Sequence, residues 1–149
     1  MNTPTKGAGV PARLMAHAAK AGRDVGSYVL YMIIADETDA AAMAKWNAYN
    51  AGADQDALAH LLGKAAEDTA PSATSMATTI QQSASPINFS MGTLVGSYAH
   101  VAAMMDEVAA TPGVKGIMLT FDDFLVGMDA FGTRIQPLMR SREHVTLAA

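Results

Sequence analysis

GIMLTFDDFLVGMDAFGTRIQPLM, residues 116–139, is the stretch that indicates how this chain folds. Its first apolar run ends abruptly in two acids, Asp122 and Asp123, and a second apolar stretch follows them. Upstream, residues 91–109 (MGTLVGSYAHVAAMMDEVA) place apolar side chains at helical spacing behind Ser97, a residue that favours the start of a helix. A Pro-Gly break separates the two segments. This succession of helix, turn, buried strand and helix is one unit of an α/β protein with a parallel sheet.

A second buried strand is predicted nearer the N-terminus. Residues 27–35, SYVLYMIIA, form a continuous apolar run, which is typical of a central strand covered on both faces. This run also ends in acids, Asp36 and Glu37. Before it, Pro11 and Gly22 mark the first turn and the end of an expected helix.

Between these strands the sequence predicts helices and one long polar excursion. Thr38 or Asp39 begins a helical region, and Gly52 divides it into two helices or one kinked helix. Residues 68–86 are rich in Ser, Thr, Ala and Gln, which predicts a surface excursion, either a lid or a poorly ordered segment. Residues 91–96 are expected to lead into the following helix as a loop.

The composition limits the class of protein. The chain has 149 residues, of which 50% are hydrophobic and only 16% are charged, as in a globular domain. A net charge of -4 gives no electrostatic footprint for nucleic acid or an anionic membrane. The absence of cysteine excludes disulfides and thiolate chemistry, and the 4 scattered histidines predict no metal site. Without a long apolar run or a signal-peptide core, a cytoplasmic protein is expected.

Several longer segments resemble one known family. GRDVGSYVLYMIIADETD at residues 22–39, NFSMGTLVGSYAHVAAMMDEVA at residues 88–109 and LTFDDFLVGMDAFGTRIQPLM at residues 119–139 are similar to the flavin-dependent monooxygenases of the bacterial luciferase superfamily. The shorter NTPT at residues 2–5 and AGAD at residues 51–54 are similar too. Within that superfamily the similarity is greatest to the pyrimidine monooxygenases, and MGTLVGSYA combined with TFDDF is its most specific part. It covers nearly the whole chain but only the C-terminal part of the family's length.

The fold class follows from the pattern and the resemblance together. Three parallel strands leave two edges uncovered, and a complete (β/α)₈ barrel needs roughly 250 residues. We therefore expect residues 1–149 to be one partial luciferase-like domain, the C-terminal portion of a (β/α)₈ TIM barrel. Residues 134–139 are expected to be its last helical turns, and the tail after Arg140 is expected to fray. The uncovered apolar surfaces predict a homo-oligomer or aggregation.

The resemblance implies an enzyme, an FMN-dependent monooxygenase (an oxidoreductase) of pyrimidine degradation. It implies reduced FMN from a separate flavin reductase, O₂ as co-substrate, and uracil or a related pyrimidine that is opened to a ureidoacrylate-type product. In such enzymes the flavin performs the oxygen chemistry, and the protein positions it and excludes water. The family's FMN-binding motifs lie mostly outside the segment present here. The alternative is a truncated, catalytically incomplete half-barrel that serves only as a structural or partner-dependent segment.

Residues at the ends of the predicted strands are candidates for a substrate pocket. Barrel enzymes build their sites at the carboxyl ends of the strands, where Asp122 and Asp123 are expected. Thr120 and Phe121 are candidates for lining a pocket beside a flavin or a pyrimidine, although Phe121 suits the core equally well. Acids in this position commonly cap the next helix, and we favour that role over catalysis. No catalytic residue is identified.

One further segment is a candidate for binding the cofactor. Gly96 and Ser97 precede a predicted helix, whose free backbone N–H groups are able to bind the phosphate of FMN. A capped helix start explains the same residues, and we favour the cap. Trp46 and Tyr49, in the helix after the first strand, are interpreted as packing residues.

Overall fold

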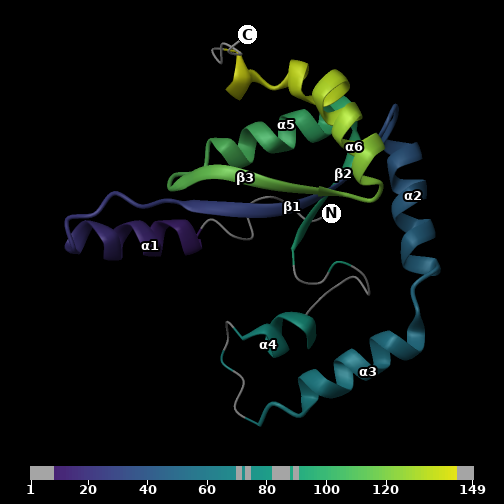
Figure 1. Cartoon of the computed structure of the whole chain (residues 1–149), viewed down its shortest axis with the longest axis horizontal. Helices are drawn as coiled ribbons and strands as arrows, with labels where there is room; N and C mark the ends of the chain where they lie inside the picture. The colour runs from purple at the N-terminus through teal and green to yellow at the C-terminus, as the bar shows by residue number, and fades with distance from the viewer. Residues whose placement is uncertain (1–8, 70–71, 73–74, 82–87, 89–90, 144–149) are drawn as a thin grey trace.

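The computed structural model of this chain describes residues 9–69, 72, 75–81, 88 and 91–143. These residues form helices and three strands, and the α/β class expected from the sequence is confirmed (Figure 1). The helices are α1 (Gly9–Lys20), α2 (Asp39–Ala51), α3 (Gln55–Ala66), α4 (Met76–Gln81), α5 (Tyr98–Ala109) and α6 (Phe124–Ala130). The strands are β1 (Ser27–Asp36), β2 (Gly92–Ser97) and β3 (Val114–Phe121).

The three strands form one parallel sheet with the order β2-β1-β3. The strand β1 is central, as its apolar sequence predicts, and Ile33 lies between Leu94 of β2 and Phe121 of β3. Parallel strands that alternate with helices fit a portion of a luciferase-like barrel. The chain passes from β2 through α5 to β3 across β1, so neighbours in sequence are not always neighbours in the sheet.

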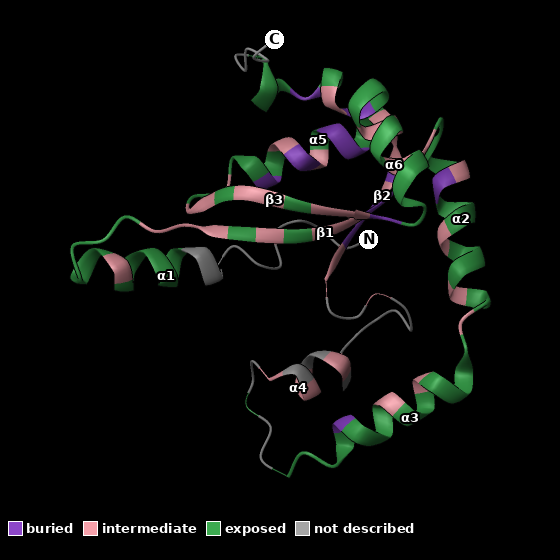
Figure 2. Ribbon diagram, viewed as in Figure 1, coloured by how far each residue is buried: buried purple, intermediate pink, exposed green. Residues whose placement is uncertain are grey.

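The core lies between α5 and one face of the sheet, where the buried residues gather in Figure 2. Ser97 begins α5 as predicted, because its hydroxyl accepts a hydrogen bond from the N–H of His100. The helix then buries Val101, Met105 and Val108, the apolar face that the sequence predicts. Each such side chain contributes about 1.5–3 kcal/mol when it is fully buried. The core cluster consists of Ile33, Leu94, Val101, Ala102, Met105, Phe121, Ile135 and Met139.

The other face of the sheet is covered only in part. Near its carboxyl end Ile34 is fully buried, where α2 packs against β1 and β2. Nearer the amino end the exposed fractions are 69% for Tyr28, 38% for Leu30 and 55% for Met118. The expectation that β1 is covered on both faces is therefore wrong for its first half, because no described element packs there.

The expected loop at residues 91–96 is wrong, because Gly92–Ser97 forms strand β2. Glycine is uncommon inside strands, so this segment did not read as a strand in the sequence. The structure shows why glycine is needed. A Cβ atom at Gly92 would overlap the ring of Tyr31, its neighbour on β1. Gly116 on β3 makes room for the ring of Tyr28 in the same way.

The helices between β1 and β2 follow the sequence closely. Thr38 is the N-cap of α2, and its hydroxyl accepts a hydrogen bond from the N–H of Ala41. The helical region is divided at Gly52 into α2 and α3, as predicted. Within the polar excursion the structure contains the short helix α4, and residues 70–71, 73–74 and 82–86 lie outside the described part.

The C-terminal segment is more ordered than its sequence suggests. A π-helix at Phe131–Ile135 and a 3₁₀ turn at Gln136–Leu138 form the expected last helical turns. The prediction that the chain frays after Arg140 is wrong for Arg140–Arg142, which form another 3₁₀ turn. The carboxylate of Asp106 on α5 accepts hydrogen bonds of 3.0 Å from the backbone N–H groups of Arg140 and Ser141. Residues 144–149 lie outside the described part.

Candidate functional site

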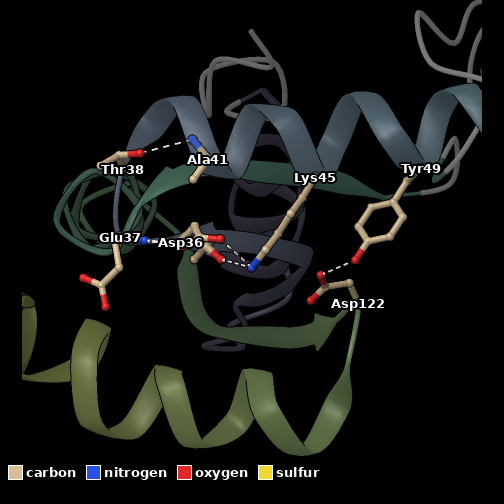
Figure 3. Close-up of polar contacts among 8 residues, drawn as sticks. Asp36, Glu37, Thr38, Ala41, Lys45, Tyr49 and Asp122 are labelled. Carbon is tan, nitrogen blue, oxygen red and sulfur yellow. Dashed lines mark hydrogen bonds and ion pairs between the residues drawn. The ribbon is translucent and has the colours of Figure 1, made fainter.

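The carboxyl ends of the strands carry a cluster of polar side chains, shown in Figure 3. Asp36 ends β1, and Asp122 directly follows β3. The helix α2 returns along these ends and presents Lys45 and Tyr49 to the two acids. We call Asp36, Lys45, Tyr49 and Asp122 the carboxyl-end cluster.

The first contact in this cluster is an ion pair. The Nζ of Lys45 lies 2.8 Å from Oδ2 of Asp36 and also donates a hydrogen bond of 3.1 Å to the carbonyl oxygen of Ala35. The Lys45 hydrogen bond, helped by the N–H of Glu37, lowers the pKa of Asp36, and Asp36 in turn raises the pKa of Lys45. Both groups are therefore charged at neutral pH, and α2 is tied to the end of β1.

The second contact joins α2 to the segment after β3. The hydroxyl of Tyr49 donates a hydrogen bond of 2.7 Å to Oδ2 of Asp122. This hydrogen bond raises the pKa of Tyr49, and the charges of Asp122 and Asp123 act in the same direction. The phenol is therefore a stable donor, and it fixes one oxygen of Asp122 while the side chains remain accessible to solvent.

The two acids after β3 have different partners. Asp123 is the N-cap of α6, and its Oδ1 accepts hydrogen bonds of 3.1 Å from the N–H groups of Leu125 and Val126. Such a cap is worth about 1 kcal/mol. Asp122 takes no part in that cap and faces Tyr49 instead. Asp122 is thus the acid of the pair whose position the next helix does not explain.

The two candidates at the end of β3 lie on opposite sides of the sheet, because side chains alternate along a strand. Phe121 is 9% exposed and belongs to the core, where its ring lies 5.9 Å from that of Phe124 and 6.3 Å from that of Phe131. Thr120 lies opposite Met32 of β1 and is half-buried. The structure brings Thr120 and Asp122 to the same end of the sheet and places Phe121 beneath them.

Gly96 and Ser97 are the last two residues of β2, next to the start of α5. The N–H of Ser97 donates a hydrogen bond of 2.6 Å to Oδ1 of Asp39, and this bond is the main cause of the lowered pKa of Asp39. Nδ1 of His100 lies 3.3 Å from the same oxygen. A phosphate that bound the N–H of Ser97 would have to displace this carboxylate. The binding of the FMN phosphate by Gly96 and Ser97 therefore stays a prediction.

Glu37 makes a separate contact at the edge of this region. Its Oε1 lies 3.1 Å from a guanidinium nitrogen of Arg134, and that guanidinium lies 5.7 Å from the ring centre of Tyr98. The contact links the end of β1 to the π-helix after α6. Since both charged side chains are largely exposed, it contributes at most about 1 kcal/mol.

Lys45 and Tyr49 are the two residues of the site that the sequence analysis missed. The sequence predicts a packing role for Tyr49 and no role for Lys45. Their spacing contains a usable signal, because residues four apart lie on the same face of a helix. A helix that follows a strand ending in acids, and carries a cation and a phenol at this spacing, is able to reach back to those acids.

Other kinds of site are not supported by the part of the chain that the structure describes. Among those residues no group of three or more His, Cys, Asp or Glu side chains is placed to hold a metal ion. None of the described helices has the length and apolar character needed to cross a membrane.

An open cleft of about 570 Å³ lies between α5, β3 and the C-terminal turns, with Met105, Ile117 and Phe131 among its lining residues. It is separate from the carboxyl-end cluster, because none of that cluster's residues lines it.

Comparison with known proteins gives one consistent result. No protein-family model matches the chain. It is 58% identical over 145 residues to pyrimidine monooxygenase RutA of Klebsiella variicola. The matched segment covers 97% of this chain and 40% of that protein. The pyrimidine monooxygenase RutA of Cronobacter sakazakii is also 58% identical, with 43% of its length covered, and that of a Caulobacter species is 59% identical, with 41% covered. The chain therefore spans about two-fifths of the length of these curated relatives.

Proposed function

We propose that this chain is part of an FMN-dependent monooxygenase that opens the ring of uracil or a related pyrimidine to a ureidoacrylate-type product. The observation that carries the proposal is the identity of 58% to a pyrimidine monooxygenase across 97% of the chain. Because the chain spans only 40% of that relative, the activity belongs to a protein that also contains the remaining part. We further propose that this reaction takes place in the cytoplasm.

In this proposal the carboxyl-end cluster forms one wall of the substrate pocket. A pyrimidine such as uracil presents ring N–H donors next to carbonyl acceptors. The carboxylate of Asp122 accepts a hydrogen bond from an N–H group, and the hydroxyl of Thr120 is able to donate to a carbonyl. Tyr49 holds Asp122 in place for this contact. Asp123 supports the wall by starting α6, and Phe121 supports it from the core.

We propose that most of the residues that bind FMN lie in the part of the relatives that this chain does not match. When bound, reduced FMN supplied by a separate flavin reductase carries the chemistry of O₂. The N–H of Ser97 is already bound by Asp39, so we give Gly96 and Ser97 the role of ending β2 and starting α5. The residues that hold the phosphate and the ring are proposed to lie in the unmatched part of the relatives.

A second candidate function is a half-barrel that needs a partner and has no activity alone. It is favoured by the sheet face at Tyr28, Leu30 and Met118, which the described residues leave uncovered. In an isolated chain this face would promote a homo-oligomer. The two candidates differ in whether the chain takes part in turnover once the remaining part is supplied.

Flavin binding and turnover by a fusion protein test the proposal. The fusion joins the chain to the unmatched part of the Klebsiella variicola relative and is compared with the chain alone. We expect the fusion, but not the chain, to quench FMN fluorescence saturably and to consume uracil with a flavin reductase and NADH. An Asp122→Asn fusion should raise KM for uracil with FMN binding unchanged. A folded fusion that binds FMN but consumes no pyrimidine would refute the substrate assignment.

A further inference from the structure

The sheet presents a bare apolar surface on the side opposite α5. The register places Leu30 of β1 next to Met118 of β3, and Tyr28 lies two pairs nearer the amino end, beside Gly116. These side chains are 38%, 55% and 69% exposed, in the order Leu30, Met118, Tyr28. Adjacent strands lie about 4.8 Å apart, so the three side chains form one continuous patch. We call Tyr28, Leu30 and Met118 the bare sheet face.

Most of the length of both edges of the same sheet is also unprotected. Within the described residues β2 and β3 are the two edge strands. Natural edge strands are usually guarded by charges, proline or a bulge. The strand β2 (GTLVGS) contains no charge and no proline. In β3 a register shift and the one charged residue, Lys115, which lies 2.7 Å from Asp24 in an ion pair, are both at the amino end, so residues 116–121 carry neither a charge nor a bulge. These edges are suited to pairing with further strands, and the bare sheet face to being covered.

We propose that the bare sheet face, with the free edge of β3, is the docking surface for the polypeptide that the relatives carry beyond the matched segment. We further propose that this polypeptide binds the chain even when it is supplied as a separate molecule. About 60% of the Klebsiella variicola relative lies outside the match, which is ample to cover one sheet face and extend its edges. The inference concerns binding alone, so it does not depend on the proposed chemistry.

The alignment itself favours this occupant over a second copy of the chain. It covers 97% of the chain and so runs through all three strands. The relatives therefore contain the same sheet together with additional polypeptide to cover it. A second copy packed face to face would cover the bare sheet face of both molecules but would leave their strand edges unpaired. The contact with the unmatched polypeptide satisfies the strand edges as well as the apolar patch.

Co-expression tests the proposal directly. The tagged 149-residue chain is produced together with the unmatched part of the Klebsiella variicola protein, purified by the tag, and its mass is measured by light scattering. We expect a one-to-one complex of the two polypeptides, formed without added FMN. The substitutions Leu30→Glu and Met118→Glu should each reduce the amount of co-purified partner about tenfold. Leu62→Glu is the matched control, because Leu62 is 47% exposed on α3, outside the bare sheet face.

Several outcomes would overturn the inference. One is recovery of the chain without its partner, either as a monomer or as a homo-oligomer. Another is a complex that forms equally well with Leu30→Glu, Met118→Glu and Leu62→Glu. If circular dichroism shows that a glutamate variant is unfolded, Met118→Gln decides, with the same loss of partner expected. A complex that forms but neither binds FMN nor consumes uracil would refute the proposed function and leave the docking surface intact.

Discussion

The hydroxyl of Tyr49 donates a hydrogen bond of 2.7 Å to Oδ2 of Asp122, although 73 positions separate the two residues in the sequence. Tyr49 lies in α2 and Asp122 directly after β3, so this bond ties a helix to the far strand of the sheet. Together with the ion pair of Lys45 and Asp36, it fixes α2 over the carboxyl ends of the strands. The position of Asp122 therefore depends on α2 as well as on its own strand.

Substitution of Asp122 by asparagine should lower the pKa of Tyr49 toward its ordinary value of 10.0. The hydrogen bond to the carboxylate is the main cause of the raised pKa, and the substitution removes the charge. The titration is followed by the ¹³Cζ shift of each tyrosine in NMR spectra. Tyr31 is the internal control, because burial raises its pKa and Asp122→Asn should leave it unchanged. An unchanged pKa of Tyr49 in the variant would show that the two side chains do not meet in solution.

The pair of Lys45 and Asp36 should stabilise the fold between acidic and strongly alkaline pH. The pKa of Asp36 is lowered, so its contribution is present above its ordinary value of 3.8 and is lost as the pH falls through the lower folded-state pKa. The pKa of Lys45 is raised, so its contribution is present below 10.5 and is lost as the pH rises through the higher folded-state pKa.

Lys45→Met tests this pair by urea unfolding at several pH values. At pH 7 we expect a loss of about 0.2–1 kcal/mol in the free energy of unfolding, because the pair is partly exposed. The difference between wild type and variant should shrink below the folded-state pKa of Asp36 and in high salt. Lys64→Met removes the more exposed pair with Glu67 and serves as the control. A difference that does not change with pH would contradict the ion-pair interpretation.

Local sequence signals predicted most of the individual elements. The apolar run of β1, the Ser97 cap of α5 and the break at Gly52 all depend on residues that are close together in the chain. Such features follow from propensity and capping, which act over a few residues. The strand β2 was not predicted, because its first glycine, Gly92, is explained only by the ring of Tyr31 on the neighbouring strand.

The site was predicted less completely than the elements. The acids at the strand ends were identified, because a parallel sheet gathers its carboxyl ends at one edge. The partners of those acids were not identified, because the contact of Tyr49 with Asp122 depends on the direction in which α2 packs across the ends of the strands. The bare sheet face was not predicted for a similar reason. An apolar strand predicts that both of its faces are buried, but it does not show which other segment packs on them.

Substitution of Asp106 by asparagine should loosen the C-terminal turn. Burial alone would raise the pKa of Asp106, but hydrogen bonds from Ser141 and Arg140 outweigh it, and the pKa is lowered. Since the side chain is only 9% exposed, we expect a loss of about 1–3 kcal/mol in the free energy of unfolding. In the wild type this contribution is present above the ordinary pKa of 3.8 and is lost as the pH falls through the folded-state pKa. Amide hydrogen exchange at Arg140 and Ser141 measures it, and unchanged protection in the variant would contradict the anchoring role.

Substitution of Gly127 by alanine should destabilise the protein, although alanine is the better helix former. A Cβ atom at Gly127 in α6 would lie 2.5 Å from Cβ and Cγ of Phe121, so the helix or the ring must move. The overlap should cost about 1–3 kcal/mol and exceed the helix-propensity gain of about 1 kcal/mol.

Gly132→Ala is the matched control for this substitution. No heavy atom lies within 4 Å of a Cβ built at Gly132, which also lies in a helical segment. We therefore expect Gly132→Ala to raise the free energy of unfolding by up to about 1 kcal/mol, while Gly127→Ala lowers it. Urea unfolding of the two variants gives the sign of each change. Two variants of equal stability would mean that α6, which Asp123 caps at the end of β3, does not pack on Phe121.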